Sequence, residues 1–88
     1  MTYQVVLSGQ ARRALSVDLP EVVAAACFEF LAGALAENPQ RVGKPLRGRL
    51  EGRYSARRGE FRIIYRIIEE QIRVEVINVR HRRDAYRG

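Results

Sequence analysis

The apolar positions in the first part of the chain predict a strand followed by a short helix. Tyr3, Val5 and Leu7 occupy every second position, which predicts a strand over residues 3–7. Ser8 is a typical helix N-cap, so a helix is expected to begin directly after it. The apolar residues that share one face of this helix are Ala11, Ala14 and Leu15.

A second, longer helix is predicted after a break at residues 18–21. Pro20 suits the first helical turn, where its missing N–H is not needed, and Glu21 suits the positive end of the helix dipole. Asn38 and Pro39 end the helical pattern. The predicted buried side of this helix consists of Val23, Ala26, Cys27, Phe30, Leu31 and Ala34.

The second half of the chain alternates between short strands and turns. Prolines and glycines punctuate residues 39–52, which are therefore expected to form a loop. Strands are predicted at residues 53–58, 61–68 and 72–79, followed by a polar tail from Arg80. Because the connecting turns are short, these strands should pair as antiparallel hairpins.

The predicted fold is therefore one α+β domain over residues 1–88. It starts with a strand and a helical hairpin and ends with a three-stranded antiparallel meander. Both helices are expected to pack on one face of a single, mostly antiparallel sheet.

Strand alternation assigns the side chains of the meander to two faces. The face expected to meet the helices carries Phe61, Ile63, Tyr65 and Ile67 of the central strand. The opposite face then collects arginines from three strands: Arg53, Arg57, Arg62, Arg66 and Arg73. Like charges on neighbouring strands destabilise a sheet, so this cluster indicates a functional surface. The alternative is an ordinary solvated surface.

The charge distribution favours a polyanionic partner. The 88 residues include 16 basic and 10 acidic ones, for a net charge of +6. Residues 1–40 hold two arginines against four acids, whereas residues 41–88 hold fourteen basic groups against six acids. Fifteen of the basic residues are arginine, whose planar guanidinium binds phosphate oxygens in pairs. Nucleic acid is therefore the expected partner ahead of a membrane surface.

Several classes of protein are excluded by the residues that the chain lacks. One cysteine and one histidine cannot form a zinc site, and no glycine-rich nucleotide-binding motif is present. Cys27 lies on the apolar side of the second predicted helix, which favours a buried thiol over a nucleophile. No apolar stretch is long enough to span a bilayer, and no secretory signal is recognisable. A cytoplasmic protein without metal or cofactor is expected.

The arginine face, His81 and Tyr86 together suit the cleavage of RNA. In this reaction the 2′-hydroxyl attacks the adjacent phosphate, a base and an acid move the protons, and cations stabilise the added charge. Arginine suits the last role because it stays protonated, and it is a poor base for the same reason. His81, expected just past the last strand, or Tyr86 should therefore transfer protons. The alternatives are a surface histidine and a packing tyrosine.

Four segments resemble the RelE/ParE superfamily of bacterial toxins, most closely its RelE branch. Residues 59–65 read GEFRIIY and residues 79–86 read VRHRRDAY, and this combination is more specific than either part. Residues 44–48 (KPLRG) and 53–57 (RYSAR) also fit. The resemblance implies a toxin of a type II toxin–antitoxin pair that cuts mRNA in the ribosomal A site without metal, leaving a cyclic phosphate. The implied partners are a cognate antitoxin, the ribosome and mRNA.

The same resemblance implies the residues of the site. The implied catalytic residues are Arg53, Arg57, Arg62, His81, Arg82 and Tyr86. Further basic residues are expected to bind RNA, namely Lys44, Arg47, Arg49, Arg66, Arg73 and Arg83. Some family members carry a lysine pair on the strand after the loop, and one of these lysines is the favoured base. This chain has Arg53 and Ser55 there, so either His81 is the base, or Arg53 acts with an unusual ionisation, or turnover is slow.

Two other functions share these features. A ParE-like toxin has the same fold but inhibits DNA gyrase and cuts nothing. ParE-type chains generally lack the full set of Arg62, His81, Arg82 and Tyr86, so this set favours the nuclease. A nucleic-acid-binding module without activity fits the charge but leaves the C-terminal motif unexplained.

Overall fold

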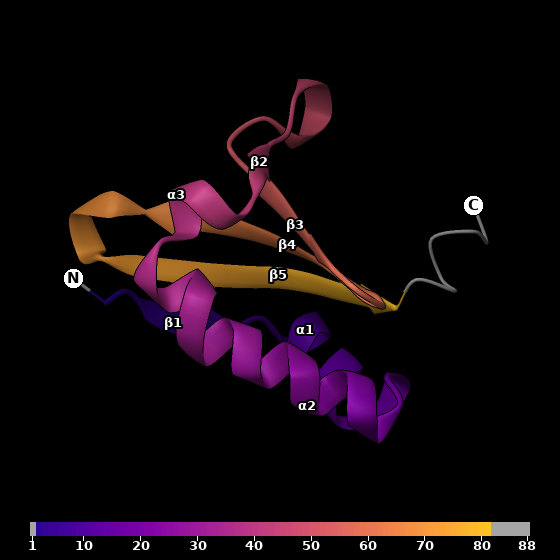
Figure 1. The fold of residues 1–88 in the computed structure, drawn as a ribbon. Coiled ribbons are helices and arrows are strands. Elements are labelled where there is room, and N and C mark those ends of the chain that lie inside the picture. The colour runs from indigo at the N-terminus through magenta and orange to yellow at the C-terminus, as the bar shows by residue number, and fades with distance from the viewer. Residues whose placement is uncertain (1, 82–88) are drawn as a thin grey trace.

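The computed structural model describes residues 2–81 and contains one five-stranded sheet with helices on one face (Figure 1). The strands are β1 (Gln4–Leu7), β2 (Lys44–Pro45), β3 (Tyr54–Arg58), β4 (Phe61–Ile68) and β5 (Arg73–His81). Their spatial order is β1-β5-β4-β3-β2. β1 runs parallel to β5, and the other neighbours are antiparallel. The predicted α+β arrangement is confirmed.

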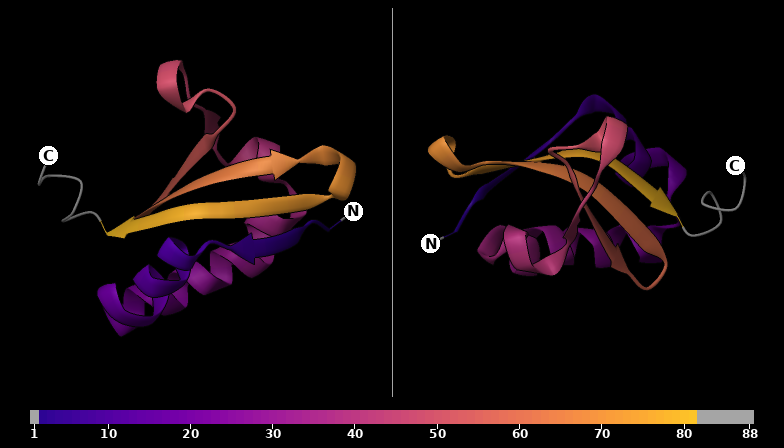
Figure 2. Two further views of the ribbon diagram at one scale, coloured as in Figure 1. Left: turned by 180° about the vertical axis from the view of Figure 1, so that it is seen from behind. Right: turned by 90° about the horizontal axis from the view of Figure 1, so that it is seen from above.

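The helical hairpin lies on one side of the sheet (Figure 2). Its helices are α1 (Gly9–Arg13) and α2 (Glu21–Phe30), which continue as π-helical turns over Ala14–Asp18 and Leu31–Leu35. The predicted cap is confirmed, because Ser8 Oγ accepts a hydrogen bond from the Ala11 N–H at 3.0 Å.

The core lies between this hairpin and the sheet. Its predicted members on β4 are confirmed, since Phe61, Ile63 and Tyr65 are buried and Ile67 packs at their margin. The helical residues buried as predicted are Ala11, Ala14, Leu15, Val23, Cys27, Phe30 and Leu31. The prediction is wrong for Ala26 and Ala34. Both are exposed, because they line an open groove between α2 and the tip of the β3–β4 hairpin.

The segment predicted as a loop over residues 39–52 contains short regular elements. They are α3 (Pro39–Val42), the two-residue strand β2 and a 3-10 turn at Gly48–Leu50. Elements this short leave no period in the sequence to detect. From β2 the chain projects away from the helices, as Figure 1 shows, and we call residues 44–52 the projecting segment.

The last strand differs from its prediction at both ends. β5 begins one residue later than expected, at Arg73, and continues through Arg80 to His81. Ile72 instead closes the preceding turn with a φ of +49°, a left-handed conformation that β-branched residues seldom adopt. The predicted tail therefore contributes two residues to the sheet.

A β-bulge in β5 changes which residues face the core. Ile64 of β4 pairs with Asn78, but the next residue, Tyr65, pairs with Val76, so Ile77 is an extra residue in β5. Core positions are even-numbered before the bulge and odd-numbered after it. Asn78 and Arg80 consequently lie on the side of the sheet away from the helices, which we call the open face.

Candidate functional site

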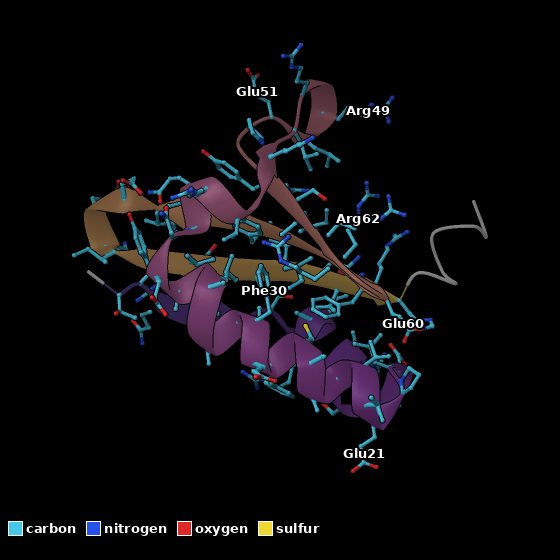
Figure 3. All side chains as sticks on the ribbon, viewed as in Figure 1. Glu21, Phe30, Arg49, Glu51, Glu60 and Arg62 are labelled. Atoms are coloured by element: carbon cyan, nitrogen blue, oxygen red, sulfur yellow. The ribbon has the colours of Figure 1, made fainter. Side chains whose placement is uncertain are left out.

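The open face is hollowed over β4 and β5, beside Arg53, the residue that precedes β3. This hollow, which we call the arginine hollow, has a volume of about 430 Å³. It is lined by Gln10, Leu50, Arg53, Arg62, Ile64, Ile77, Asn78 and Arg80. Figure 3 shows Arg62 pointing away from α2, toward the side on which Arg49 projects. The guanidinium groups of Arg53, Arg62 and Arg80 therefore surround one concavity.

Arginines also lie opposite one another across three strands. Arg62 of β4 pairs with Arg57 of β3 on one side and with Arg80 of β5 on the other. Directly opposite side chains share a face, so these residues form one row across the open face. Within residues 2–81, none of them is in an ion pair. Uncompensated cations this close together attract a polyanion.

The predicted arginine surface is thereby divided. Arg53, Arg57 and Arg62 lie at or beside the hollow, whereas Arg66 and Arg73 lie toward the other end of the sheet. Arg66 Nη2 forms an ion pair with Glu75 Oε1 at 2.6 Å, which neutralises its charge locally. The uncompensated row of positive charge thus lies at the end of the sheet that carries the hollow.

Three further predicted RNA-binding residues lie on the projecting segment. Lys44, Arg47 and Arg49 are all exposed. Leu50 of the same segment forms a wall of the arginine hollow. These cations therefore flank the hollow without lining it.

A buried tyrosine holds the base of the projecting segment. Tyr65 Oη donates a hydrogen bond to the carbonyl oxygen of Pro39 at 2.6 Å, and its ring stacks on Tyr54 with the centroids 5.5 Å apart. Burial, with a smaller contribution from Tyr54, raises the pKa of Tyr65 to about 12, so the hydroxyl stays protonated as a donor. Gly43 fits beside it because a Cβ there would overlap Tyr65 Oη and lie 2.9 Å from the Ser55 carbonyl oxygen.

The start of α1 is fixed to β5 at the bulge. Ser8 Oγ donates a hydrogen bond to the carbonyl oxygen of Ile77 at 2.6 Å, and the Ser8 N–H donates to that of Val76 at 2.9 Å. The extra residue of a bulge loses its partners in the ladder, and the serine hydroxyl supplies a donor to it. Two residues further on, Gln10 lines the arginine hollow.

Sequence reasoning missed three polar residues of the hollow, which are Gln10, Asn78 and Arg80. Arg80 is predicted in the tail, and strict alternation from Val76 assigns Asn78 to the core. A one-residue bulge reverses the alternation, and no sequence period reveals it. The available signal is Asn78 itself, a polar residue inside an otherwise apolar strand.

His81 lies on the opposite side of the sheet from the arginine row. The prediction that it follows the last strand is wrong, because it is the final residue of β5. His81 pairs with Phe61, a buried residue of the core face, whereas Arg80 pairs with Arg62. The other C-terminal candidates, Arg82, Arg83 and Tyr86, lie outside the described residues.

Cys27 is buried in α2, and burial raises the pKa of its thiol to about 12. A thiol that stays protonated is not an effective nucleophile. Across the described part of the chain, no three His, Cys, Asp or Glu side chains are grouped so that they could hold a metal ion. The helices of residues 2–81 are all too short or too polar to cross a membrane.

Comparison with known proteins identifies the family. The family described as ParE toxin of type II toxin-antitoxin system, parDE, matches residues 19–86. Toxin RelE of Mycobacterium tuberculosis is 49% identical over 85 residues, which are 97% of this chain and 87% of that protein. Toxin RelG of the same organism is 48% identical over 87 residues, 99% of each chain. The chain belongs to the RelE/ParE superfamily of type II toxins.

Solved structures agree with the RelE-type fold of this toxin. The toxin–antitoxin complex RelBE2 of Mycobacterium tuberculosis matches with a TM-score of 0.90 and 46% identity, covering 93% of this chain and 100% of that chain. The intact E. coli RelBE complex matches with a TM-score of 0.71 and 25% identity, covering 88% and 93% of the two chains. The predicted resemblance to the RelE branch is confirmed.

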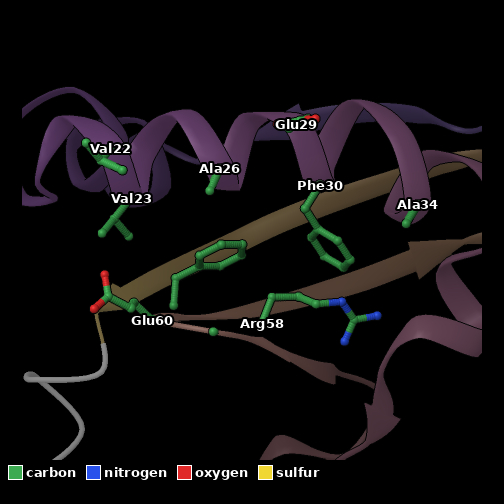
Figure 4. A pocket seen from close by; sticks show the side chains of 10 residues that line it. Val22, Val23, Ala26, Glu29, Phe30, Ala34, Arg58 and Glu60 are labelled. Carbon is green, nitrogen blue, oxygen red and sulfur yellow. The ribbon is translucent and has the colours of Figure 1, made fainter.

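This RelE-type toxin has another concavity on the helix side of its sheet, shown in Figure 4. The α2 groove, as we call it, has a volume of about 480 Å³ between α2 and the tip of the β3–β4 hairpin. Its apolar helical residues are Val22, Val23, Ala26 and Phe30 of α2 and Ala34 of the π-helical turn that follows. From the hairpin, Arg58 extends beneath Phe30, with its guanidinium carbon 4.8 Å from the ring centroid. Glu29 and Glu60 add charges to the lining.

Proposed function

We propose that this RelE-type toxin is a ribosome-dependent endoribonuclease that cuts mRNA in the ribosomal A site and so inhibits translation. The observation that carries the proposal is the arginine hollow, where Arg53, Arg62 and Arg80 surround one concavity without an acid among its lining residues. The high identity to proteins named Toxin RelE and Toxin RelG also supports it. In this proposal guanidinium groups take the place of a metal ion.

The RNA supplies the nucleophile in the proposed reaction. The 2′-oxygen bonds to the adjacent phosphorus and loses its proton to a base. The bond from phosphorus to the 5′-oxygen of the next nucleotide breaks, and that oxygen gains a proton. The products are a 2′,3′-cyclic phosphate and a 5′-hydroxyl. Arg53, Arg62 and Arg80 donate charge-assisted hydrogen bonds to the phosphate oxygens, whose negative charge increases in the transition state.

The proton acceptor lies outside the lining of the hollow. The polar residues that line it are arginines and the amides Gln10 and Asn78, and neither group titrates near neutrality. We assign stabilisation of the phosphate to the hollow, with Arg57 and Arg82 adding to the positive field. In this proposal Tyr86, or groups of the ribosome and mRNA, transfer the protons. A site that the ribosome completes is consistent with cleavage on the ribosome.

His81→Gln is expected to retain most of the cleavage activity, because the strand register turns His81 toward Phe61 and away from Arg62. Removal of a general base typically slows a reaction by about 10²–10⁴. The measurement is single-turnover cleavage on programmed ribosomes across a pH series. A loss of that size would instead identify His81 as the base.

Expression in a bacterial cytoplasm tests the function as a whole. We expect growth arrest and new mRNA 5′ ends inside translated codons, read by sequencing after a short induction. The family description names ParE, so gyrase inhibition is the second candidate. DNA supercoiling is therefore assayed in the same cells. Inhibited gyrase with intact mRNA would establish the second candidate, and a folded protein that affects neither would reject both.

We also propose that a cognate antitoxin binds this toxin, as antitoxins do in the RelBE2 and E. coli RelBE complexes. The α2 groove suits an apolar segment of such a partner. Its residues Val22, Ala26, Phe30 and Ala34 follow one another at helical-turn spacing, and Val22 is 81% exposed. Exposed apolar surface of this kind is typical of binding sites.

Ala26→Arg is expected to weaken antitoxin binding by about tenfold or more, because it places a charge in an apolar groove. Ala25→Arg is the matched control, since Ala25 is an exposed neighbour that does not line the groove. Titration of each purified toxin with its antitoxin gives the affinities, and mRNA cleavage should be unaffected in both. Equal affinities for the two variants would contradict the assignment of the groove.

A further inference from the structure

A second hollow adjoins the arginine hollow and shares a wall with it. This hollow, which we call the α1 hollow, has a volume of about 370 Å³. Gln10, Asn78 and Arg80 line both hollows, whereas Arg13 and Asp18 line only the second. The two hollows thus form one trough that runs from Leu50 of the projecting segment, past the end of β5 that β1 does not cover, to Asp18 at the end of the helical turn after α1.

We propose that the α1 hollow binds the base of a nucleotide next to the scissile phosphate, and that Asp18 selects bases with an exocyclic amino group over uracil. The inference rests on the proposed cleavage of RNA. It identifies Asp18 as a specificity-determining residue. Asp18 is not singled out by the sequence pattern, and it lies outside the arginine row.

The position of Arg80 connects the two hollows. A phosphate held by Arg80 lies at their boundary, so the nucleotide attached to it extends into the α1 hollow. The floor there consists of the small or apolar residues Ala14, Leu19 and Val79, against which the face of a base can pack. The amides of Gln10 and Asn78 supply both donors and acceptors at the shared wall.

The charge of Asp18 determines what the α1 hollow prefers. Among the described residues that line either hollow, Asp18 is the only acid, and in this part of the chain it forms no ion pair. A carboxylate accepts hydrogen bonds and repels phosphate, so Asp18 does not assist binding of the RNA backbone. It favours a hydrogen-bond donor, such as the exocyclic amino group of cytosine, adenine or guanine, over a carbonyl oxygen. Uracil presents a carbonyl oxygen in place of the amino group of cytosine, and the carboxylate repels that oxygen.

Asp18→Asn tests this selection directly. The asparagine amide both donates and accepts hydrogen bonds, so the variant should also bind uracil. Its preference for bases with an exocyclic amino group over uracil should be about tenfold weaker than that of the original toxin. Glu21→Gln is the matched control, because it removes a negative charge three residues away and lines neither hollow. A general effect of charge on RNA binding would change both variants alike.

The experiment has a cleavage arm and a binding arm. In the first, ribosomes are programmed with randomised codons, and the base composition around each cut is compared among the original toxin, Asp18→Asn and Glu21→Gln. In the second, the affinities of the three proteins are measured for short single-stranded RNAs that differ only in one cytosine or uracil. We expect one position at which the original toxin and Glu21→Gln disfavour uracil and Asp18→Asn does not.

The two arms separate failure of this inference from failure of the proposed function. If no protein cuts RNA but the binding arm shows the expected discrimination, the base site stands and the nuclease is rejected. If the toxin cuts RNA and Asp18→Asn has the same base preference as the original in both arms, the selection by Asp18 is overturned. Equal affinities of all three proteins for both RNAs, with no cleavage, would reject both.

Discussion

Arg62→Ala is expected to slow RNA cleavage by about 10²–10³ and to leave the fold intact. Arg62 is the middle residue of the arginine row, between Arg57 and Arg80, and it lines the arginine hollow. Its side chain is exposed on the open face, so its removal creates no cavity in the core. Single-turnover cleavage of programmed ribosomes at saturating toxin measures the loss, and a thermal melt checks the fold.

Arg66→Ala is the control for this experiment. It removes a guanidinium group from the same face of β4, about 13 Å along the strand from Arg62. Because Arg66 is already paired with Glu75 and lies outside the lining of the hollow, its loss should affect cleavage far less. Equal losses in the two variants would mean that general positive charge, and not the hollow, determines the rate.

Ile63→Ala is expected to lower the free energy of unfolding by about 2–5 kcal/mol. Ile63 is adjacent to Arg62 in the chain but points to the other side of the sheet, where it is fully buried. It lies on β4, the middle strand of the sheet, between the buried residues Ala56 and Val79. Denaturant titration with an unchanged m-value measures the difference.

Val17→Ala provides the comparison for stability. Val17 is 73% exposed, so its truncation should change the free energy of unfolding by no more than about 0.5 kcal/mol. If Arg62→Ala unfolds the protein while Ile63→Ala does not, the two faces of β4 are assigned the wrong way round.

The sequence predicts the elements that have a strong period. Strict alternation over the eight residues of β4 gives both its bounds and its faces correctly. The N-cap at Ser8 and the break near Pro20 likewise locate α1 and α2. These signals are local, because each depends on residues that lie within a few positions of one another.

Features that depend on distant contacts are not predictable in this way. The segment over residues 39–52 takes its course from the buried Tyr65 hydroxyl, which binds the carbonyl of Pro39 from 26 positions away. Ala26 and Ala34 lie on the core side of the helical pattern, but the hairpin does not close over them. An apolar stripe alone does not show whether another element covers it.

The candidate site was predictable in part. Arg53 and Arg62 line the hollow, and Arg57 lies beside Arg62, as strand alternation requires. Arg80 lies on the open face, opposite Arg62, at a position that the sequence does not indicate, and His81 lies on the core side, opposite Phe61. The extension of β5 and its bulge account for both differences, and the catalytic roles stay predictions.

The bulge also bears on how this toxin aligns with its relatives. Removal of Ile77 would give β5 a regular ladder and still leave Val79 toward the core and Arg80 opposite Arg62. Loss of one residue between Asn78 and Arg80 would instead misalign the arginine row. A relative with a one-residue gap at position 77 could therefore keep the same arginine row on its open face. It would lack the Ile77 carbonyl oxygen, which accepts the hydrogen bond from the Ser8 hydroxyl in this toxin. In such a relative, residue 8 would keep only its role as the N-cap of α1, in which its side chain accepts from the N–H of residue 11.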